Sequence, residues 1–386
     1  MKKILFTLHR MNVGGVEKAF LGMLNALPHD DLEVHVAFFV PEGGFIRYLP
    51  EWIHLHTIDP LFNNAAFIEH PIKRTIHDLL RLRAGAIPRF IAWVRSKLKG
   101  DKSIISHYLL RNDDALGMEF DLAVNYASPH EYLDYYVSHH IKARRRAMWI
   151  HFDVSKCFNS SRAIKDTMAS ADRIFIVSET GRRIFNERFP ELTDKTVTFR
   201  NIISPEVVKQ DALRPSTFRR VEGALNIVTV GRLNPEKGHS LAIAAIARLR
   251  AMGITAVLHI VGGGRTEYDC RRQAVESGID DMVRFYGSQI NPYPYMAQAD
   301  LYLQPSLHEG YCITIAEAKI FEAPIVATDF TGAREQLMSR PNAVIAEDFT
   351  PEAIADAIVI AKDLPRCSGD DTCVNDMDSF LELLKD

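Results

Sequence analysis

Two glutamates lie where a loop gives way to a helix in the segment SLHEGYCITIAEAKIFEAPIVATDF, residues 306–330. Glu309 stands beside Gly310 and Tyr311 in the expected loop, and Glu317 follows eight positions later, one turn into the expected helix. A carboxylate accepts paired hydrogen bonds from vicinal hydroxyls, so two of them can hold the hydroxyls of two different sugars. The same spacing also fits a capping acid and an ordinary helix-surface acid.

Two cations flank a second loop, in TVGRLNPEKGHSLAIAA. A strand ends at Val230, and Arg232 and Lys237 then lie on either side of a proline before a helix that begins near Ser240. Two cations and a helix N-terminus directed at one point suit a diphosphate. The alternative is that both side chains are solvated loop charges.

Glycines follow two of the expected strands. In LHIVGGGRTEYDC, Gly263 is the middle one of three, and in MNVGGVEKAF, Gly14 and Gly15 open the first helix. Glycine lets the backbone approach a ligand closely, although such runs are often only flexible turns. Gly263 is not part of a G-x-G-x-x-G motif with an acid some twenty residues later, so no nicotinamide dinucleotide site is expected.

Strand-like apolar runs alternate with helical segments in two successive sets. The first set contains KKILFTLH, EVHVAFFV, DLAVNYA, RRAMWIHF and RIFIVSE, with helices expected over 19–27 and 160–170. The second contains LNIVTVGRL, TAVLHIVGGG, VRFYGS, LYLQPS and PIVATDF, with helices over 240–252, 267–277, 293–298 and 313–321. Nearly continuous apolar strands predict parallel sheets covered on both faces. The chain is therefore predicted to be α/β, with two doubly wound domains, a polar hinge at 201–220 and a cleft between the carboxyl ends of the two sheets.

Composition agrees with two ordinary globular domains. The 386 residues are 47% hydrophobic and 25% charged, and domains typically hold roughly 100 to 200 residues. A net charge of −3 gives no chain-wide basic bias, so no nucleic-acid partner is expected.

Cysteine spacing and the start of the chain indicate a cytoplasmic protein. The five cysteines are irregularly spaced and contain no C-x-x-C, which predicts neither a disulfide framework nor a metal site. The apolar run in MKKILFTLHRMN is too short for a signal sequence or a membrane span and is expected to form a buried strand.

Four motifs in this order, GGVEKA, VGRLNPEKG, VGGG and SLHEGYCITIAEAKIFEAPIVATDFTGARE, resemble the retaining nucleotide-sugar glycosyltransferases of the GT-B fold, family four. The resemblance covers most of the chain and is strongest over residues 225–340. It implies two Rossmann-like domains facing a central cleft, with acceptor binding in 1–205 and donor binding in 206–386, and a last helix that packs back on the first domain.

The resemblance also implies roles for individual residues. Arg232 and Lys237 would bind the donor diphosphate, Glu317 the ribose hydroxyls and Glu309 the hydroxyls of the donor sugar. His151, in MWIHFD, would lie near the anomeric centre, whereas a lone histidine after a strand is otherwise more often structural. The remaining expected donor-binding residues are Gly14, Gly15, Gly263, Gly310 and Tyr311.

The sequence departs from the family pattern near the donor-sugar pocket. Cys312 and Thr331 stand where family members commonly have glycine, and Glu322 and Ala323 stand where a glycine usually precedes the next strand. These departures concern the shape of the pocket rather than the phosphate and ribose contacts.

The implied mechanism needs neither metal nor cofactor. Arg232, Lys237 and helix N-termini would stabilise the charge that develops on the leaving diphosphate. No Asp-x-Asp dyad is placed to hold a divalent ion against a diphosphate. As in the family's front-face route, the leaving phosphate would take the acceptor's proton, and Glu309 would orient the sugar.

Basic amphipathic segments occur in the first domain, in 72–102 and in KARRRAMW. They suit an anionic membrane surface or a lipid-phosphate acceptor, which would make the protein peripheral on the inner face of the plasma membrane. The alternative is that the apolar face packs on the sheet and the charges are solvated.

The resulting hypothesis is a hexosyltransferase that moves a sugar from a UDP-sugar to a glycan or lipid-linked acceptor in bacterial cell-surface polysaccharide synthesis. A nucleotide-sugar epimerase of the same fold and a non-catalytic sugar-nucleotide-binding subunit are the alternatives. Pairing of Glu309 with Glu317 disfavours the epimerase, and the presence of Glu309, Arg232 and Lys237 disfavours the non-catalytic subunit.

Overall fold

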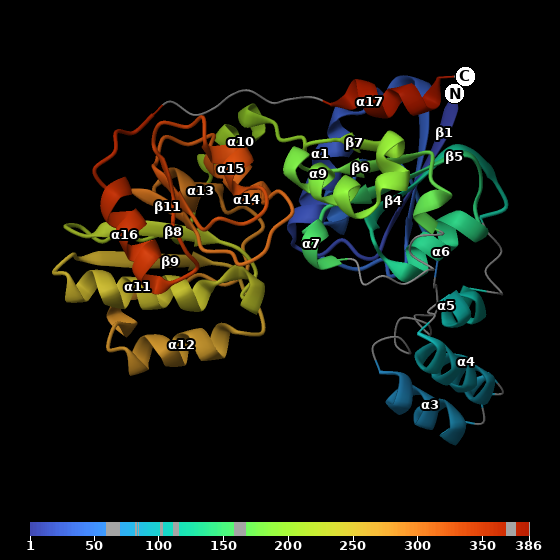
Figure 1. The fold of residues 1–386 in the computed structure, drawn as a ribbon, viewed down its shortest axis with the longest axis horizontal. Helices are drawn as coiled ribbons and strands as arrows, with labels where there is room; N and C mark the ends of the chain where they lie inside the picture. Colours follow the sequence, from blue (N-terminus) through green and yellow to red (C-terminus); the bar gives the residue numbers. More distant parts are fainter. Residues whose placement is uncertain are drawn as a thin grey trace. The chain divides into compact units, whose positions relative to one another are not determined.

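The computed structural model describes residues 1–58, 70–81, 83, 85–100, 103–110, 116–157, 167–367 and 376–385. By their internal contacts these residues form two compact units (Figure 1). The N-terminal unit comprises Met1–Asn12, Val16–Arg200 and Asn375–Asp386, and the C-terminal unit comprises Asn201–Val374 with Val13–Gly15. The sequence predicts a domain boundary between residues 205 and 206, and the structure divides the chain after Arg200.

A parallel sheet forms the centre of the N-terminal unit. Its seven described strands follow the order β3-β2-β1-β4-β5-β6-β7. Their bounds are β1 (Lys2–Leu8), β2 (Leu32–Phe38), β3 (His54–Thr57), β4 (Glu119–Ser128), β5 (Lys142–Ile150), β6 (Arg173–Ile176) and β7 (Thr196–Thr198). Residues along β1 and β4 are buried on both faces, as expected for a parallel sheet covered by helices on each side.

The described helices of this unit are α1 (Gly15–Ala26), α3 (Pro71–Leu80), α4 (Ala86–Lys99), α5 (Ser103–Leu110), α6 (Glu131–His139), α7 (Val154–Cys157), α9 (Glu179–Arg188) and α17 (Met377–Leu381). In one core, Leu133 and Tyr136 of α6 pack against Leu5 and Ala123 of the sheet. No helix among the described residues is long and apolar enough to cross a membrane.

The C-terminal unit contains a second parallel sheet with its helices on both faces. Six described strands follow the order β10-β9-β8-β11-β12-β13, which repeats the order of the first six strands of the other unit. They are β8 (Leu225–Val230), β9 (Ala256–Val261), β10 (Val283–Phe285), β11 (Leu301–Gln304), β12 (Ile325–Ala327) and β13 (Ala343–Ile345). The helices are α10 (Pro205–Ala212), α11 (His239–Ala251), α12 (Glu267–Glu276), α13 (Tyr293–Ala297), α14 (Ile313–Ala318), α15 (Ala333–Leu337) and α16 (Pro351–Ala361).

Alternation along these strands builds two separate cores. Ile227 and Leu301 belong to the core covered by α11, α12 and α16, whereas the adjacent Val228 and Tyr302 belong to the core covered by α10, α13, α14 and α15. Because the side chains of a strand point alternately to the two faces, an almost continuous apolar sequence fills both cores. This pattern explains why β8, β9 and β11 are recognisable from sequence.

Both sheets reverse their strand order at one point, between β1 and β4 in the first unit and between β8 and β11 in the second. In open parallel sheets, ligands bind outside the carboxyl ends of the strands at such a switch point. The loops that follow β8 and β11 contain Arg232, Lys237 and Glu309. The topology therefore brings the predicted phosphate loop and the predicted sugar loop to neighbouring strands.

The sequence analysis missed several short elements. β3, β7 and β13 have only three or four residues each, and β3 consists of HLHT, which has no apolar run. The segment 201–220, expected to be a hinge, contains α10, whose cap is the Ser204 side chain accepting from Val207 N. The helix expected over 160–170 lies largely outside the described residues.

The C-terminal helix α17 belongs to the N-terminal unit. Phe380 is fully buried there, and its ring lies 5.8 Å from that of Phe6 in a stacked arrangement and 6.0 Å from those of Trp149 and Phe175. Arg145 also donates a hydrogen bond to the carbonyl of Glu382, over 3.3 Å. The last residues of the chain thus complete the core built by the first.

Replacing Phe380 with alanine should destabilise the N-terminal unit by about 3–5 kcal/mol, the usual cost of deleting a buried aromatic ring. All three tryptophans (Trp52, Trp93, Trp149) lie in this unit, so their fluorescence during urea unfolding reports on it alone. The exposed Lys385→Ala should change stability by less than about 0.5 kcal/mol. Equal midpoints for the two variants would show that α17 does not stabilise the unit.

Candidate functional site

Two loops of the C-terminal unit are joined by a close backbone contact. Gly238 ends the single 3₁₀ turn Pro235–Lys237 with φ +66°, and a Cβ at this position would lie 1.9 Å from the carbonyl oxygen of Pro305. Only glycine fits, because both the conformation and the space exclude a side chain. Leu307 N donates to Glu236 O over 2.8 Å beside this contact. The loop after β8 is thereby fixed against the loop after β11.

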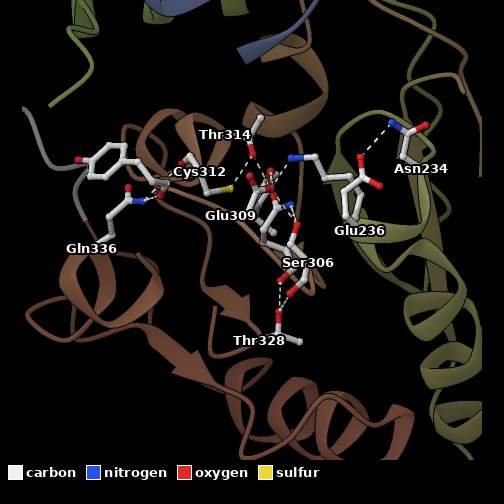
Figure 2. A network of polar contacts seen from close by, with 12 residues as sticks. Asn234, Glu236, Ser306, Glu309, Cys312, Thr314, Thr328 and Gln336 are labelled. Carbon is white, nitrogen blue, oxygen red and sulfur yellow. Dashed lines mark hydrogen bonds and ion pairs between the residues drawn. The ribbon is translucent and has the colours of Figure 1, made fainter. Parts of the chain in front are cut away.

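Lys237 and Glu309 form an ion pair at this junction. Lys237 Nζ donates to Glu309 Oε1, and Ser306 Oγ donates to the same oxygen over 3.0 Å (Figure 2). The two paired side chains are 19% and 11% exposed, so most of each lies out of solvent. The structure therefore brings a cation from the predicted phosphate loop to the acid of the predicted sugar loop.

Electrostatics keeps this lysine charged. Burial lowers the pKa of Lys237, but the neighbouring Glu309 carboxylate outweighs it, and the pKa is raised above its ordinary value. Arg232 is exposed, and its charge lies near enough to Lys237 to oppose this rise and to help lower the pKa of Glu236. The loop after β8 thus presents two cations, one paired and partly buried and one in solvent.

A series of buried hydrogen bonds, which starts at the end of β11, supports Glu309. Gln304, the last residue of β11, accepts at Oε1 from Tyr302 OH over 2.8 Å and from Thr314 Oγ1 over 2.9 Å. Its Nε2 donates to Ser306 Oγ over 2.8 Å, which continues the series to Glu309. Sequence reasoning missed this support, although a glutamine at the end of an apolar strand was an available signal.

Glu317 occupies a different environment from Glu309. It lies within α14 and is fully buried, and Tyr293 OH donates to its Oε1 over 3.0 Å. Burial raises the pKa of Tyr293, and the Glu317 carboxylate raises it further, so the hydroxyl keeps its proton and remains a donor. The two glutamates are therefore at different depths, with Glu309 in the loop and Glu317 in the core.

No group of three or more histidine, cysteine, aspartate or glutamate side chains that could hold a metal ion occurs in the part of the chain that the structure describes. Among these residues, the polar groups around Glu309 are a lysine, hydroxyls and an amide. Such groups suit hydroxyl and phosphate ligands.

A comparison with protein families identifies the domain that contains Lys237, Glu309 and their partners. Residues 215–366 match the family described as glycosyl transferases group 1. This part of the chain is a group 1 glycosyltransferase domain. It contains Arg232, Lys237, Gly263, Glu309 and Glu317, whereas Gly14, Gly15 and His151 lie outside the match.

Similar proteins of known sequence are also named as glycosyltransferases. An uncharacterized glycosyltransferase of Methanocaldococcus jannaschii is 26% identical over 176 residues, covering 45% of this chain and 43% of the relative. The N-acetylgalactosamine-N,N'-diacetylbacillosaminyl-diphospho-undecaprenol 4-alpha-N-acetylgalactosaminyltransferase of Campylobacter jejuni is 34% identical over 110 residues, covering 28% of this chain and 29% of the relative. The chain spans less than half the length of these relatives.

Solved structures extend the similarity to nearly the whole chain. The crystal structure of Anabaena HepE in complex with UDP-glucose has a TM-score of 0.68 at 18% identity and covers 94% of this chain and 90% of that one. With its two parallel-sheet units, the chain has the GT-B fold.

The departure at Cys312 has a physical explanation in this glycosyltransferase domain. Cys312 caps α14 with φ +67°, a left-handed conformation that costs a non-glycine residue roughly 1–2 kcal/mol. The side-chain amide of Gln336 donates to the carbonyls of Tyr311 and Cys312, and Cys312 Sγ lies 3.3 Å from Thr314 Oγ1. Local hydrogen bonds hold a conformation for which glycine is the usual choice.

The three glycines after β9 pack against the loop after β8. A Cβ on Gly262 would lie 1.8 Å from Gly231 O, and one on Gly264 would lie 2.4 Å from Leu233 O. Leu233 N donates to Gly263 O over 3.0 Å. Gly262 and Gly264 are thus required for packing between loops. Contact of Gly263 with a ligand stays a prediction.

The other predicted residues also follow strands in the chain. Gly14 lies between β1 and α1, Gly15 is the first residue of α1, and His151 directly follows β5. The His151 ring stacks at 6.1 Å on that of Trp149 and lies 4.7 Å from that of Tyr126. These contacts position the imidazole, and its role near a donor stays a prediction.

One further histidine, His239, lies two residues after Lys237 and is affected by its charge. His239 is the first residue of α11 and is only 3% exposed. Burial, assisted by the positive charge of Lys237, lowers its pKa from the ordinary 6.5 to about 4. It is therefore neutral in the folded protein at neutral pH.

This histidine should make the C-terminal unit acid-sensitive. His239 is protonated near pH 6.5 in the unfolded chain but only near pH 4 in the folded chain. Its contribution to the free energy of unfolding is therefore fully present above pH 6.5, and up to roughly 3 kcal/mol is lost as the pH falls from 6.5 to 4. His239→Gln should make the melting temperature depend less on pH in this range, whereas replacing the exposed His308 in the same way should not. Identical profiles for wild type and His239→Gln would contradict this assignment.

Proposed function

We propose that this chain is a retaining, metal-independent glycosyltransferase that uses a nucleoside diphosphate sugar, a UDP-sugar, as donor. The Lys237–Glu309 ion pair carries the proposal, because it joins a phosphate-binding cation and a sugar-binding acid at the switch point of a group 1 glycosyltransferase domain. Such an arrangement can recognise both halves of a sugar nucleotide.

Departure of the nucleoside diphosphate is the step for which the cations are placed. Negative charge builds up on the leaving phosphate as the glycosidic bond breaks, and Arg232 and Lys237 stabilise it electrostatically. The N-terminus of α11, a helix of 13 residues that begins two residues after Lys237, adds its dipole. Because Lys237 is already held by Glu309, little reorganisation is needed.

Glu309 orients the donor sugar. Lys237 and Ser306 both engage Oε1, and no described residue hydrogen-bonds to Oε2, which can therefore accept from a sugar hydroxyl. A carboxylate so strongly engaged is a poor nucleophile. Retention is then best served by a front-face route in which the leaving phosphate takes the acceptor's proton.

Names of similar proteins support the choice of donor and acceptor. Anabaena HepE was crystallised with UDP-glucose, and the Campylobacter jejuni relative is named for a diphospho-undecaprenol substrate. We therefore propose a UDP-sugar donor and a glycan or lipid-linked acceptor, in bacterial cell-surface polysaccharide synthesis. The nucleotide sugar is a substrate, so no cofactor is assigned.

A donor screen followed by a transfer assay tests this function. UDP-, GDP- and ADP-sugars are first compared by thermal stabilisation of the folded chain, which reports binding by mass action. The stabilising donor is then incubated with undecaprenyl-diphosphate-linked saccharides, with and without chelator, and the anomeric configuration of the product is determined by NMR. Inversion, or a strict need for a divalent ion, would overturn the proposed mechanism.

Removing either cation should slow transfer and weaken nucleoside diphosphate binding. Losing one group that stabilises developing charge typically costs about 10²–10³ in turnover, and we expect this range for Lys237→Ala and for Arg232→Ala. The exposed Arg248→Ala, in the same unit, is the matched control and should leave the rate unchanged. Full activity of both loop variants would remove the diphosphate assignment.

The two glutamates should differ in which kinetic constant they control. Glu309→Ala should lower turnover far more than nucleotide affinity, because a misplaced sugar costs rate through lost orientation. Glu317→Ala should mainly weaken nucleotide binding, because a ribose contact is similar in the ground and transition states. Calorimetry with free nucleoside diphosphate and steady-state kinetics measure the two quantities.

Burial of Glu317 calls for a control on folding. Glu317→Gln keeps the shape of the side chain, and Tyr293→Phe removes only the hydroxyl that donates to it. Weak nucleotide binding by Glu317→Gln at an unchanged melting temperature would support the ribose contact. Weak binding by Glu309→Ala together with normal turnover at saturating donor would show that the two roles are wrongly assigned.

A further inference from the structure

Helices α3 and α4 form a layer outside the sheet of the N-terminal unit. They lie between β3 and β4 in the chain; α3 packs on α4, α4 on α5, and α5 on α6. Figure 1 shows α3 and α4 beyond α5, away from the sheet of their own unit. Their outer surfaces are thus not needed to cover the sheet.

The polarity of α3 is the reverse of that of a helix packed on a core. Its apolar residues Ile72, Ile76 and Leu80 recur at four-residue spacing and, with Leu79, are all exposed. Its polar residues Thr75 and Asp78 are buried. A globular helix normally turns the apolar stripe inward, so this outward stripe requires a different partner.

An ion cluster occupies the inner face instead. Asp78 accepts from Arg74 Nε over 3.1 Å, is paired with Arg89 of α4 and lies 3.4 Å from Arg83. Burial raises the pKa of Asp78, but the arginines and His77 outweigh it, so the pKa is lowered and the carboxylate stays charged. The cluster fixes α3 on α4 with their apolar stripes outward.

Helix α4 repeats the outward stripe and adds flanking charges. Ile87, Ile91 and Leu98 are exposed on one side of the helix, opposite the buried Ala92 and Ser96. At 3.6 residues per turn, the exposed Arg95 and Lys97 lie roughly a quarter-turn to either side of this stripe. An apolar stripe bordered by cations is the pattern of a helix that lies in a membrane interface.

The local charge favours an anionic partner. Residues 71–100 contain eight lysines and arginines against one acid, Asp78, whereas the whole chain has a net charge of −3. A second copy of the chain would place this basic surface against an identical basic surface. An anionic bilayer instead complements the charges and accepts the apolar side chains.

We propose that α3 and α4 bind the surface of an anionic phospholipid bilayer. The exposed isoleucines and leucines enter the boundary between headgroups and acyl chains, and Arg95 and Lys97 contact the headgroup phosphates. This inference goes beyond the transfer reaction and does not depend on it, because it rests only on the polarity and charge of the two helices.

Vesicle flotation with the full chain tests the proposal. We expect binding to phosphatidylcholine vesicles that contain about 30% phosphatidylglycerol. Partitioning to vesicles of phosphatidylcholine alone, or at high salt, should be at least about tenfold weaker. Arg95→Gln/Lys97→Gln should lower partitioning to anionic vesicles by more than about tenfold, since each surface cation contributes about fivefold. Leu80→Ser/Leu98→Ser should lower it similarly through lost apolar burial.

Matched variants in the other unit control for general charge and hydrophobicity. Leu80 and Leu98 are 80% and 82% exposed, so their replacement should leave the fold intact, and Leu213→Ser/Met338→Ser alters residues that are 86% and 76% exposed. Arg219→Gln/Arg248→Gln removes two exposed charges from the C-terminal unit. Both control variants should partition within about twofold of wild type.

Three results would overturn the proposal. These are no binding to anionic vesicles, equal loss in the control and helix variants, or a dimer in sedimentation that Leu80→Ser/Leu98→Ser dissociates while no vesicle binding is seen. The last result would assign the surface to a second copy of the chain. Nucleoside diphosphate binding, measured on the same samples, tells a failure of this proposal from a failure of the proposed reaction.

Discussion

The close approach of Gly238 to the carbonyl of Pro305 is the constraint on which the site depends. It leaves no room for a Cβ, and it places the loop after β8 directly against the loop after β11. Lys237, one residue before the glycine, then reaches Glu309, and each side chain lowers the cost of burying the other's charge. Without this contact the cation and the acid would be two separate surface charges, which are worth little to each other in water.

Burial of both faces of the sheet determines where that contact can form. A parallel sheet with a core on each side needs crossover helices on both faces, and winding in two directions from a central pair creates the switch point between β8 and β11. The loops leaving that pair are the ones whose outer ends are not covered by a crossover. Polar residues such as Gln304 and Ser306 are tolerated in this buried position because each one is hydrogen-bonded to the next.

Sequence alone predicted the elements with strong periodicity and the loops that carry charge. The strands β8, β9 and β11 were predicted because their apolar runs are nearly continuous, and Arg232, Lys237 and Glu309 were placed correctly on the loops that follow strands. Short edge strands such as β3 were missed because their residues are polar and their pairing depends on neighbours far away in sequence. The ion pair itself could not be predicted, since both charges were expected to face a ligand rather than each other.

The left-handed Cys312 shows how firmly the sugar loop is defined. A conformation that costs roughly 1–2 kcal/mol persists only where surrounding contacts specify it, and here Gln336 binds the adjacent carbonyls while the Thr314 hydroxyl contacts the thiol. Thr314 also donates to Gln304, so the strained residue and the support of Glu309 share one hydrogen-bond network. A glycine at this position would remove the strain but would also remove the thiol that contacts this network. Replacing Cys312 with glycine would therefore relax the backbone locally but leave Glu309 less constrained. This explains how a residue disfavoured by its backbone conformation can be compatible with a precisely held carboxylate.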